Sequence, residues 1–264
     1  MAVALVFTGC TNIATPEELI EPPELNLEKQ SMKEALEKFL PEDSTITALP
    51  NLDGVDKEMA FSPIDLNDDG QLEMIAFYKD KNTKLMGMLI LSNKRDKWEK
   101  ISDIKLNSFD ILQFKVLDLD NDKNKEIVLG TYSDESISYG KKLTILSFKD
   151  NKVTSILEMP YAGMALGDLD KDASYEIAIL YQNEEMIENR LRMMRVAGNK
   201  VSRIDEKVFP QGVDPYSIAI GNIYDDEEVI FVDSFSGIYE GRTDIFFFKD
   251  KKIKDIEDYK GFKL

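Results

Sequence analysis

Four acidic side chains are spaced along one short segment in a way that suits a bound metal ion. Asp168, Asp170, Asp172 and Glu176 take positions 1, 3, 5 and 9 of a loop. Carboxylates at these positions can fold inward around one hard cation, and Ca²⁺ takes about six to eight such oxygen ligands. The apolar run that follows, residues 177–180, is typical of a buried strand. The segment therefore predicts a calcium loop that leads directly into a strand.

The same arrangement recurs along the chain at a nearly constant interval. Loops that begin at Asp65 and Asp118 have the same spacing, and a degenerate copy begins at Asn222. The first residues, 65, 118, 168 and 222, are 53, 50 and 54 positions apart. The fourth copy has Asn222 and Tyr224 at positions 1 and 3 and is shorter, so we expect it to bind no calcium. A period near 50 residues indicates a repeat architecture.

The composition restricts the functions that such loops can serve. The chain of 264 residues has a formal net charge of −17, and the three complete loops supply eleven carboxylates at positions 1, 3, 5 and 9. This charge repels phosphates, so we exclude nucleic acid as a partner and disfavour direct contact with anionic lipid. There is no histidine, which removes the usual general base and the commonest transition-metal ligand. Cys10 is the only cysteine, so no intramolecular disulfide can form.

Each acidic loop must be held in place by strands on either side of it. A second set of marks, the polar turns that precede Trp98, Val153, Val201 and Ile253, has intervals of 55, 48 and 52 residues. Each repeat thus contains an acidic loop, two apolar strands, a tight polar turn and an amphipathic strand. Four short antiparallel strands in about 50 residues form the blade of a β-propeller. We therefore expect an all-β fold of four-stranded blades with one short N-terminal helix.

The loop pattern, acids at positions 1, 3, 5 and 9 before an apolar strand, resembles the FG-GAP (VCBS-type) repeat of integrin α-chain propellers and bacterial surface proteins. The resemblance covers about residues 44–264. It implies Ca²⁺ held by side chains at positions 1, 3, 5 and 9 and a backbone carbonyl at position 7. Position 6 keeps its glycine only at Gly70, and Lys123 and Ala173 would each cost about 1–2 kcal/mol in a left-handed backbone. The implied ligands are Asp65, Asn67, Asp69 and Glu73; Asp118, Asp120, Asp122 and Glu126; and Asp168, Asp170, Asp172 and Glu176.

The acidic loops allow two other interpretations. An EF-hand needs flanking helices and a bidentate glutamate at position 12, whereas these loops carry the last acid at position 9 and precede β-branched residues. Three solvated acidic turns that bind nothing are the other alternative, and it stays open at this point.

The number of strands raises a question about closure. The segment 44–49 looks like the outer strand of a blade, yet it precedes the first repeat. We expect four repeats to be the front portion of a longer propeller of about seven blades. The alternative is a closed four-bladed ring in which this strand is spare.

The first ten residues resemble the end of a bacterial lipoprotein signal peptide. Residues 1–10 are an apolar run that ends in two small residues and Cys10. The resemblance implies cleavage before Cys10 and a diacylglycerol on its thiol, which would anchor the protein at the extracellular face of the bacterial membrane. An ordinary buried strand with a chance cysteine is the alternative. Residues 11–25 predict a tether, and residues 26–41 predict an amphipathic helix that ends at Pro41.

These features together favour a binding or scaffolding module over an enzyme. We expect a membrane-anchored extracellular lipoprotein whose calcium-stabilised propeller binds a protein or a glycan. The alternative is a carbohydrate-active enzyme or its accessory domain, because two carboxylates suffice for a glycosidase. The calcium loops account for every well-placed acid, so no catalytic pair can be named. A clustered, exposed patch of loop tyrosines would favour a glycan ligand; the candidates are Tyr132, Tyr139, Tyr181 and Tyr239.

Overall fold

The computed structural model describes residues 27–47, 61–95, 97–132, 140–183, 188–223, 227–237 and 240–256. The chain divides into two compact units, Met1–Lys38 and Phe39–Leu264. The predicted signal peptide with Cys10 and the predicted tether lie outside the described residues, so both stay predictions.

The predicted N-terminal helix is present as α1 (Leu27–Phe39). Its buried side chains, Met32, Ala35 and Leu36, follow the i, i+3, i+4 spacing of one helix face, as the sequence predicted. The helix ends before Pro41, whose ring cannot continue it. Among the described residues, no helix is long and apolar enough to cross a membrane.

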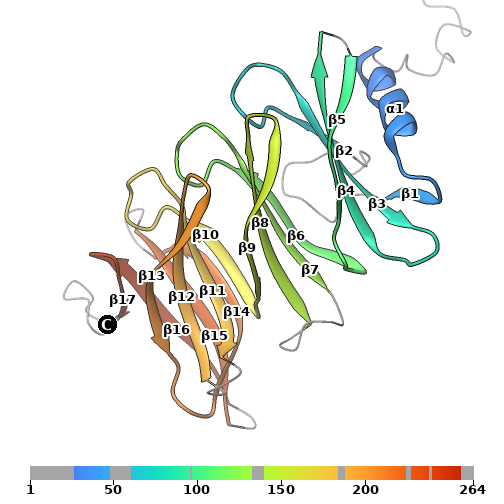
Figure 1. The fold of residues 1–264 in the computed structure, drawn as a ribbon. Coiled ribbons are helices and arrows are strands. Elements are labelled where there is room, and N and C mark those ends of the chain that lie inside the picture. Colours follow the sequence, from blue (N-terminus) through green and yellow to red (C-terminus); the bar gives the residue numbers. More distant parts are fainter. Residues whose placement is uncertain are drawn as a thin grey trace, which may run out of the picture. The chain divides into compact units, whose positions relative to one another are not determined.

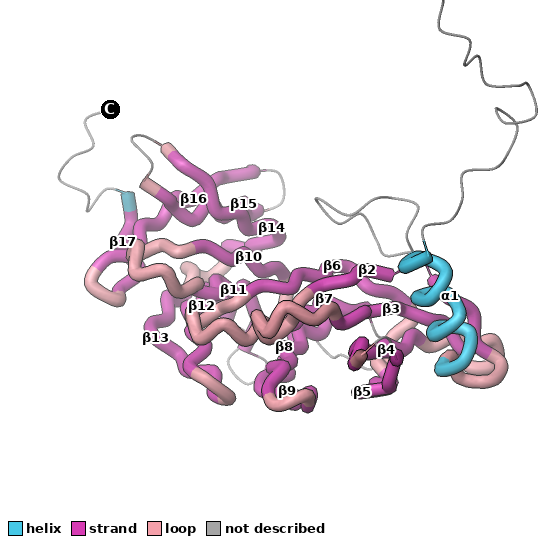
Figure 2. Tube along the Cα trace, turned by 90° about the horizontal axis from the view of Figure 1, so that it is seen from above, coloured by secondary structure: helices cyan, strands magenta, loops and turns pink. Residues whose placement is uncertain are grey.

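The second unit is built almost entirely of strands, in four sheets that follow one another in chain order (Figures 1 and 2). Neighbouring strands in each sheet are antiparallel. This confirms the predicted repeat of antiparallel four-stranded units. Sheet 1 contains β1 (Ser44–Thr47), β2 (Phe61–Ile64), β3 (Glu73–Asp80), β4 (Met86–Lys94) and β5 (Lys97–Lys105). Sheet 2 contains β6 (Asp110–Leu117), β7 (Glu126–Tyr132), β8 (Lys141–Lys149) and β9 (Lys152–Pro160). Sheet 3 contains β10 (Gly163–Gly167), β11 (Glu176–Asn183), β12 (Glu188–Ala197) and β13 (Lys200–Val208). Sheet 4 contains β14 (Val213–Asn222), β15 (Glu228–Ser236), β16 (Glu240–Lys249) and β17 (Lys252–Asp255).

The predicted polar turns join the third and fourth strands of the sheets. In sheet 2 the turn residues Asp150 and Asn151 have φ of 51° and 56°, and in sheet 4 Asp250 and Lys251 have φ of 54° and 59°. Two successive left-handed residues define the type I′ turn, whose twist matches that of antiparallel strands. The turn chemistry therefore fixes the register of these hairpins locally.

The strand that looked spare in the sequence is part of sheet 1, which corrects our prediction. β1 pairs with the far half of β3, from Thr47 opposite Phe77 onward, and β2 pairs with the near half, up to Phe61 opposite Ala76. β1 and β2 therefore occupy one edge position in succession, so sheet 1 is four strands wide like the others. The strand is an inner-edge strand rather than an outer one, and the argument for additional blades from a spare strand no longer holds.

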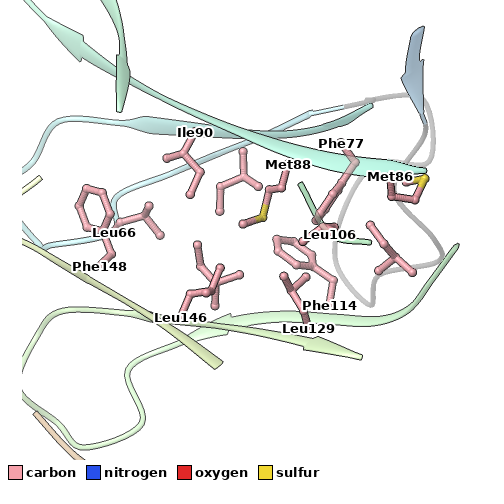
Figure 3. Packing of buried hydrophobic residues seen from close by; sticks show 13 residues of the cluster. Leu66, Phe77, Met86, Met88, Ile90, Leu106, Phe114, Leu129, Leu146 and Phe148 are labelled. Carbon is pink, nitrogen blue, oxygen red and sulfur yellow. The ribbon is translucent and has the colours of Figure 1, made fainter. Parts of the chain in front are cut away.

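Three hydrophobic cores join the four sheets. The core between sheets 1 and 2 brings side chains of β3 and β4 against those of β6, β7 and β8 (Figure 3). Phe77 and Phe114 meet edge to face in it, with ring centroids 5.1 Å apart. Comparable cores lie between sheets 2 and 3 and between sheets 3 and 4. The two central strands of each sheet, such as β3 and β4 in sheet 1, are thus buried against a neighbouring sheet. Repeats that cannot bury a core alone are stabilised in this way.

The sheets confirm an all-β fold of four-stranded antiparallel units with one short helix. The fourth strands, β5, β9, β13 and β17, contact one another in succession. Within the described residues no sheet curls or closes on itself. A closed propeller stays a prediction.

Candidate metal centres

The three complete acidic loops occupy the same place in successive sheets, between the first and second strands. They span residues 65–72, 118–125 and 168–175, and the acid at position 9 is the first residue of β3, β7 or β11. The strands therefore fix both ends of each loop. Because the loops repeat, their geometry can be compared position by position.

The aspartate at position 1 folds each loop by accepting backbone hydrogen bonds. In the second loop, Asp118 accepts from the N–H of Asp122 (3.1 Å) and of Lys123 (2.8 Å). In the third loop, Asp168 accepts from the equivalent N–H groups of Asp172 (3.0 Å) and Ala173 (2.9 Å). Asp65 does the same in the first loop. The three loops therefore share one turn, closed by a carboxylate that the same loop supplies.

The same hydrogen bonds influence the acidity of the first loop. Burial tends to raise the pKa of Asp65, but the N–H groups of Gly70 and Asp69 outweigh it and leave the pKa below its ordinary value. Asp65 is thus held as a carboxylate, the form that a cation needs.

Two positions of each loop have left-handed backbone. At position 6, Gly70, Lys123 and Ala173 have φ of 80°, 74° and 69°, which confirms the expected conformation. Position 4 is also left-handed, and the sequence analysis missed it; its residues are Asp68, Asn121 and Lys171, with φ of 56°, 59° and 60°. Asparagine and aspartate tolerate the left-handed region better than other side chains. Asp68 and Asn121 could therefore have indicated the conformation of position 4 from the sequence.

The glutamate at position 9 is buried and closes the loop onto its strand. Glu73, Glu126 and Glu176 are 1%, 2% and 0% exposed. One oxygen of each accepts the backbone N–H of the leucine at position 2, at 3.0, 3.1 and 2.9 Å. This leaves the second oxygen to serve another partner. Burial raises the pKa of Glu126 to about 7, and the nearby acids add to this effect.

The leucine at position 2 was not identified as important from the sequence, although all three loops have it. Leu66, Leu119 and Leu169 are 0%, 0% and 7% exposed, and each lies in one of the three cores. Figure 3 shows Leu66 pointing into the core between sheets 1 and 2. The leucine anchors the acidic loop to the hydrophobic interior, so the acids around it are held in a fixed frame.

Successive loops are also joined to one another. The N–H of Lys125, at position 8 of the second loop, donates to the carbonyl of Leu66 in the first at 2.7 Å. The N–H of Tyr175, at position 8 of the third loop, donates to the carbonyl of Leu119 in the second at 2.9 Å. The loops thus form a hydrogen-bonded series along one end of the sheets.

Two groups of acids have the geometry to hold a metal ion. In the second loop, ligand oxygens of Asp118, Asp120 and Asp122 lie within 4.8 Å of one another, and in the third loop those of Asp168, Asp170 and Glu176 do so. Oδ1 of Asp120 is buried without a hydrogen-bond partner. Among the described residues the first loop's acids do not form such a group. Its position 3 is Asn67, whose amide donates to Asp69 at 3.0 Å.

An arginine lies among the acids of the third loop. Arg195 on β12 stands opposite Glu176 in the strand register and contacts its carboxylate. Its terminal nitrogens also lie 3.0 Å from Asp170 and 2.7 Å from Asp172. The guanidinium therefore meets three of the four acids that the sequence analysis named in this loop. Arg195 could not be identified from the sequence, since it is nineteen residues beyond Glu176 and only the strand register brings the two together.

The fourth loop is described only in part. Residues 224–226 lie outside the described residues, so the prediction that this copy binds no calcium is not tested. Glu228 begins β15 as its counterparts begin β3, β7 and β11, and its Oε2 is buried without a hydrogen-bond partner.

Only two of the four aromatic candidates, Tyr132 and Tyr181, lie among the described residues, so the predicted tyrosine patch is not tested. Tyr132 is 46% exposed, whereas the hydroxyl of Tyr181 donates to Glu206 at 2.8 Å. Tyr139 and Tyr239 lie outside the described residues. An exposed pair that the sequence analysis did not name lies on sheet 4, where the rings of Tyr216 and Phe235 stack with centroids 4.6 Å apart.

A polar cavity of about 240 Å³ lies between β5 of sheet 1 and β8 and β9 of sheet 2. Lysine and hydroxyl groups line much of it. Lys142 on β8 pairs with Glu158 on the adjacent strand β9 at 3.4 Å. Its polar lining includes Ser102, Lys105, Lys142, Thr144, Ser155 and Glu158.

Comparison with known proteins identifies no family for this chain. No family model matches the sequence, and no curated protein matches it. Among solved structures, the chain is similar to a Bacillus licheniformis rhamnogalacturonan lyase PL11 over 67% of its length (19% identity, TM-score 0.40) and to the exotype rhamnogalacturonan lyase YesX over 67% (16% identity, TM-score 0.41). The matched regions span 39% and 38% of those lyases. Similarity of this size assigns no activity to the chain.

Proposed function

We propose that the acidic loops bind Ca²⁺ and that the ion stabilises the repeat fold. The observation that carries this proposal is the group Asp118, Asp120 and Asp122, whose oxygens lie within 4.8 Å of one another while Oδ1 of Asp120 is buried and unpartnered. The donors are all oxygens, which suit hard divalent cations. Ca²⁺ fits better than Mg²⁺, because a loop that offers many carboxylate and carbonyl oxygens favours the ion with the larger coordination number. In this arrangement Asp65, Asn67 and Asp69 hold the ion of the first loop.

The ion would have a structural role. The loops crowd carboxylates against a buried glutamate, and a divalent cation offsets that repulsion. At about 1 mM Ca²⁺ and a Kd of about 0.1 mM, each occupied loop stabilises the fold by about 1.4 kcal/mol. Binding at successive loops would strengthen the hydrogen-bonded series that joins them.

The biological role proposed for this scaffold is a binding or scaffolding module without catalytic activity. It would act at the extracellular face of a bacterial membrane, attached through a lipid on Cys10, and its ligand would be a protein or a glycan. Support comes from the composition, which lacks histidine, and from the acids, whose best-placed members are engaged in the loops.

The test is a titration of Ca²⁺ into the full chain by calorimetry, with thermal melts in calcium and in chelator. We expect saturable binding and a higher melting temperature in calcium. Asp120→Asn should reduce the calcium-dependent rise, whereas Asp150→Asn, in the β8–β9 turn, should not. No binding heat together with identical melts would refute the proposal.

A glycan-directed role is the second candidate, as an accessory domain or as a carbohydrate-active enzyme. Two features favour it: the stacked, exposed rings of Tyr216 and Phe235, and the lysine- and hydroxyl-lined cavity between sheets 1 and 2. Aromatic faces bind sugar rings, and lysines pair with carboxylates of acidic sugars.

Acidic oligosaccharides provide the test of this second candidate. We expect oligogalacturonides to bind with a measurable heat that Lys142→Ala reduces, while Lys152→Ala, which is outside the cavity lining, leaves it unchanged. A product with new ultraviolet absorbance on incubation would indicate a lyase. Absence of both binding and product would rule out this probe as a ligand.

A further inference from the structure

The three acidic loops differ at one position that lies outside the loops themselves. The residue opposite the position-9 glutamate on the third strand is Ser92 in sheet 1, Ser147 in sheet 2 and Arg195 in sheet 3. The strand register makes these three positions equivalent. Two repeats therefore place a small hydroxyl beside the loop, and one places a cation there.

We propose that the guanidinium of Arg195 replaces the bound cation in the third loop, so that this loop needs no metal ion. The inference rests on the calcium role proposed above and refines it. One terminal nitrogen of Arg195 lies 3.0 Å from each oxygen of Asp170 and in contact with Glu176, and the other lies 2.7 Å from Asp172. These are positions 3, 9 and 5 of the loop. Arg195 thus offers fixed N–H donors to the acids that a metal ion would otherwise draw together.

The contacts are partly buried, and only Asp172, whose side chain is 45% exposed, resembles one half of a surface ion pair. The side chain of Arg195 is 19% exposed, that of Asp170 is 20% exposed and that of Glu176 is fully buried. A buried carboxylate without a partner is strongly unfavourable, so Glu176 depends on this cation. Surface pairs, by contrast, contribute little.

A divalent ion and this arginine cannot use the same oxygens. Ca²⁺ needs its ligands at about 2.3–2.6 Å, but both oxygens of Asp170 already accept from Arg195, and Oε1 of Glu176 forms an ion pair with it. The positive charge of the guanidinium also repels the ion at this range. The arginine therefore occupies the carboxylates of the third loop and excludes Ca²⁺ from them.

The other two loops have no comparable arrangement among the described residues. In the first loop, Ser92 donates its hydroxyl to Glu73 at 3.0 Å, which leaves the charge of the acids unbalanced. In the second loop, Lys149 approaches Asp122 only at 3.7 Å and is 47% exposed. Ser147 is buried on the same strand and bonds to Asn199. Neither of the first two loops thus has a guanidinium among its acids, so their negative charge remains available to an ion.

The experiment is a comparison of Ca²⁺ stoichiometry in the full chain, by calorimetry with the metal alone, among four proteins. We expect about two ions for the unchanged chain and about three for Arg195→Ser, which restores the residue of the other repeats. Arg195→Lys should stay at two, because the positive charge remains. In the reverse exchange, Ser147→Arg should lose one ion. In chelator, Arg195→Ser should melt several degrees below the unchanged chain, and calcium should recover much of that loss.

The outcomes separate this inference from the calcium proposal itself. One additional ion in Arg195→Ser, relative to the unchanged chain, supports the inference even if the unchanged chain binds none, in which case only the general calcium proposal fails. Three ions in the unchanged chain would mean that Arg195 yields to Ca²⁺, and would overturn the inference. So would an equal number of ions in the unchanged chain and a folded Arg195→Ser. If Arg195→Ser folds in neither buffer, Ser147→Arg decides, since an unchanged stoichiometry there overturns the inference as well.

Discussion

Glu206 on β13 shows how a single partly buried acid is kept charged in this acidic protein. Its side chain is 10% exposed and accepts from Nε of Arg192 at 2.7 Å, from the hydroxyl of Tyr181 at 2.8 Å and from Arg190. Burial alone would raise the pKa of Glu206, but the two arginines and the tyrosine outweigh it and lower the pKa to about 2.

This shift predicts an acid-sensitive contribution to stability. The folded pKa of Glu206, about 2, lies below its ordinary value of 4.5. The contribution is therefore complete above about pH 4.5 and is lost as the pH falls through 2. We expect Glu206→Gln to lose up to about 3 kcal/mol at pH 7 and to show a flatter stability profile between pH 5 and 2. Urea unfolding at several pH values measures this. Glu158→Gln, which is more exposed, should retain the profile of the unchanged chain; identical profiles in all three proteins would contradict the assignment.

At the scale of elements, the edge strand of sheet 1 is assembled from two separate segments. β1 contributes four residues along the far half of β3, and β2 contributes four along the near half. Without β1, the outer half of β3 would have an unpaired edge, which exposes backbone groups to other chains.

The pairing predicts a localised effect of a proline in β1. Thr45 pairs with Lys79, and the hydrogen bond from the N–H of Lys81 to the carbonyl of Asp43 places residue 45 among those whose N–H faces β3. Proline at position 45 therefore removes a ladder donor and restricts the strand backbone. We expect Thr45→Pro to destabilise the fold by about 2–4 kcal/mol and to speed amide exchange in residues 77–80. Amide hydrogen exchange followed residue by residue is the measurement. Thr45→Val, which keeps the donor and the shape of the side chain, should leave exchange there slow, and equal exchange in both variants would argue against the pairing.

The elements that the sequence predicted correctly are those with local causes. Turn residues such as Asp150 and Asn151 determine their own hairpin, and the alternation of acids marks each loop, so both could be found without a structure. The two-part edge strand could not be predicted from the sequence. Its halves, β1 and β2, are far apart along the chain, and only their pairing with β3 makes them one edge. Arg195 could not be predicted for the same reason. The register of β11 and β12 places it opposite Glu176, and the spacing of residues along the chain does not indicate that register.

At the scale of the whole molecule, stability depends on neighbours. Each of the three cores is shared by two sheets, and each of the first two acidic loops accepts a backbone hydrogen bond from the next. In such an array the free energy of folding is close to a sum of repeat terms and interface terms. A change at one interface should therefore weaken both sheets that share it.

Leu119 offers a test of this coupling. It anchors the second acidic loop and is fully buried in the core between sheets 2 and 3. We expect Leu119→Ala to cost about 2–5 kcal/mol through lost burial and the cavity left behind. The loss should appear as one cooperative transition at lower temperature, followed by circular dichroism and calorimetry. Leu112→Ala, an exposed leucine on β6, should change the melt little. Two separated transitions for Leu119→Ala would indicate that the sheets unfold independently.

The divided edge of sheet 1 also identifies a place where the chain can gain or lose sequence. Thr47 and Phe61 pair with the adjacent residues Phe77 and Ala76, so a peptide bond made directly between them would complete one unbroken strand in the same register. Closing a loop of thirteen residues costs roughly 2 kcal/mol of chain entropy, which such a shortened protein would not lose on folding. Conversely, a foreign peptide inserted between Thr47 and Phe61 would interrupt no pairing with β3, which makes this a suitable position for an engineered tag or epitope.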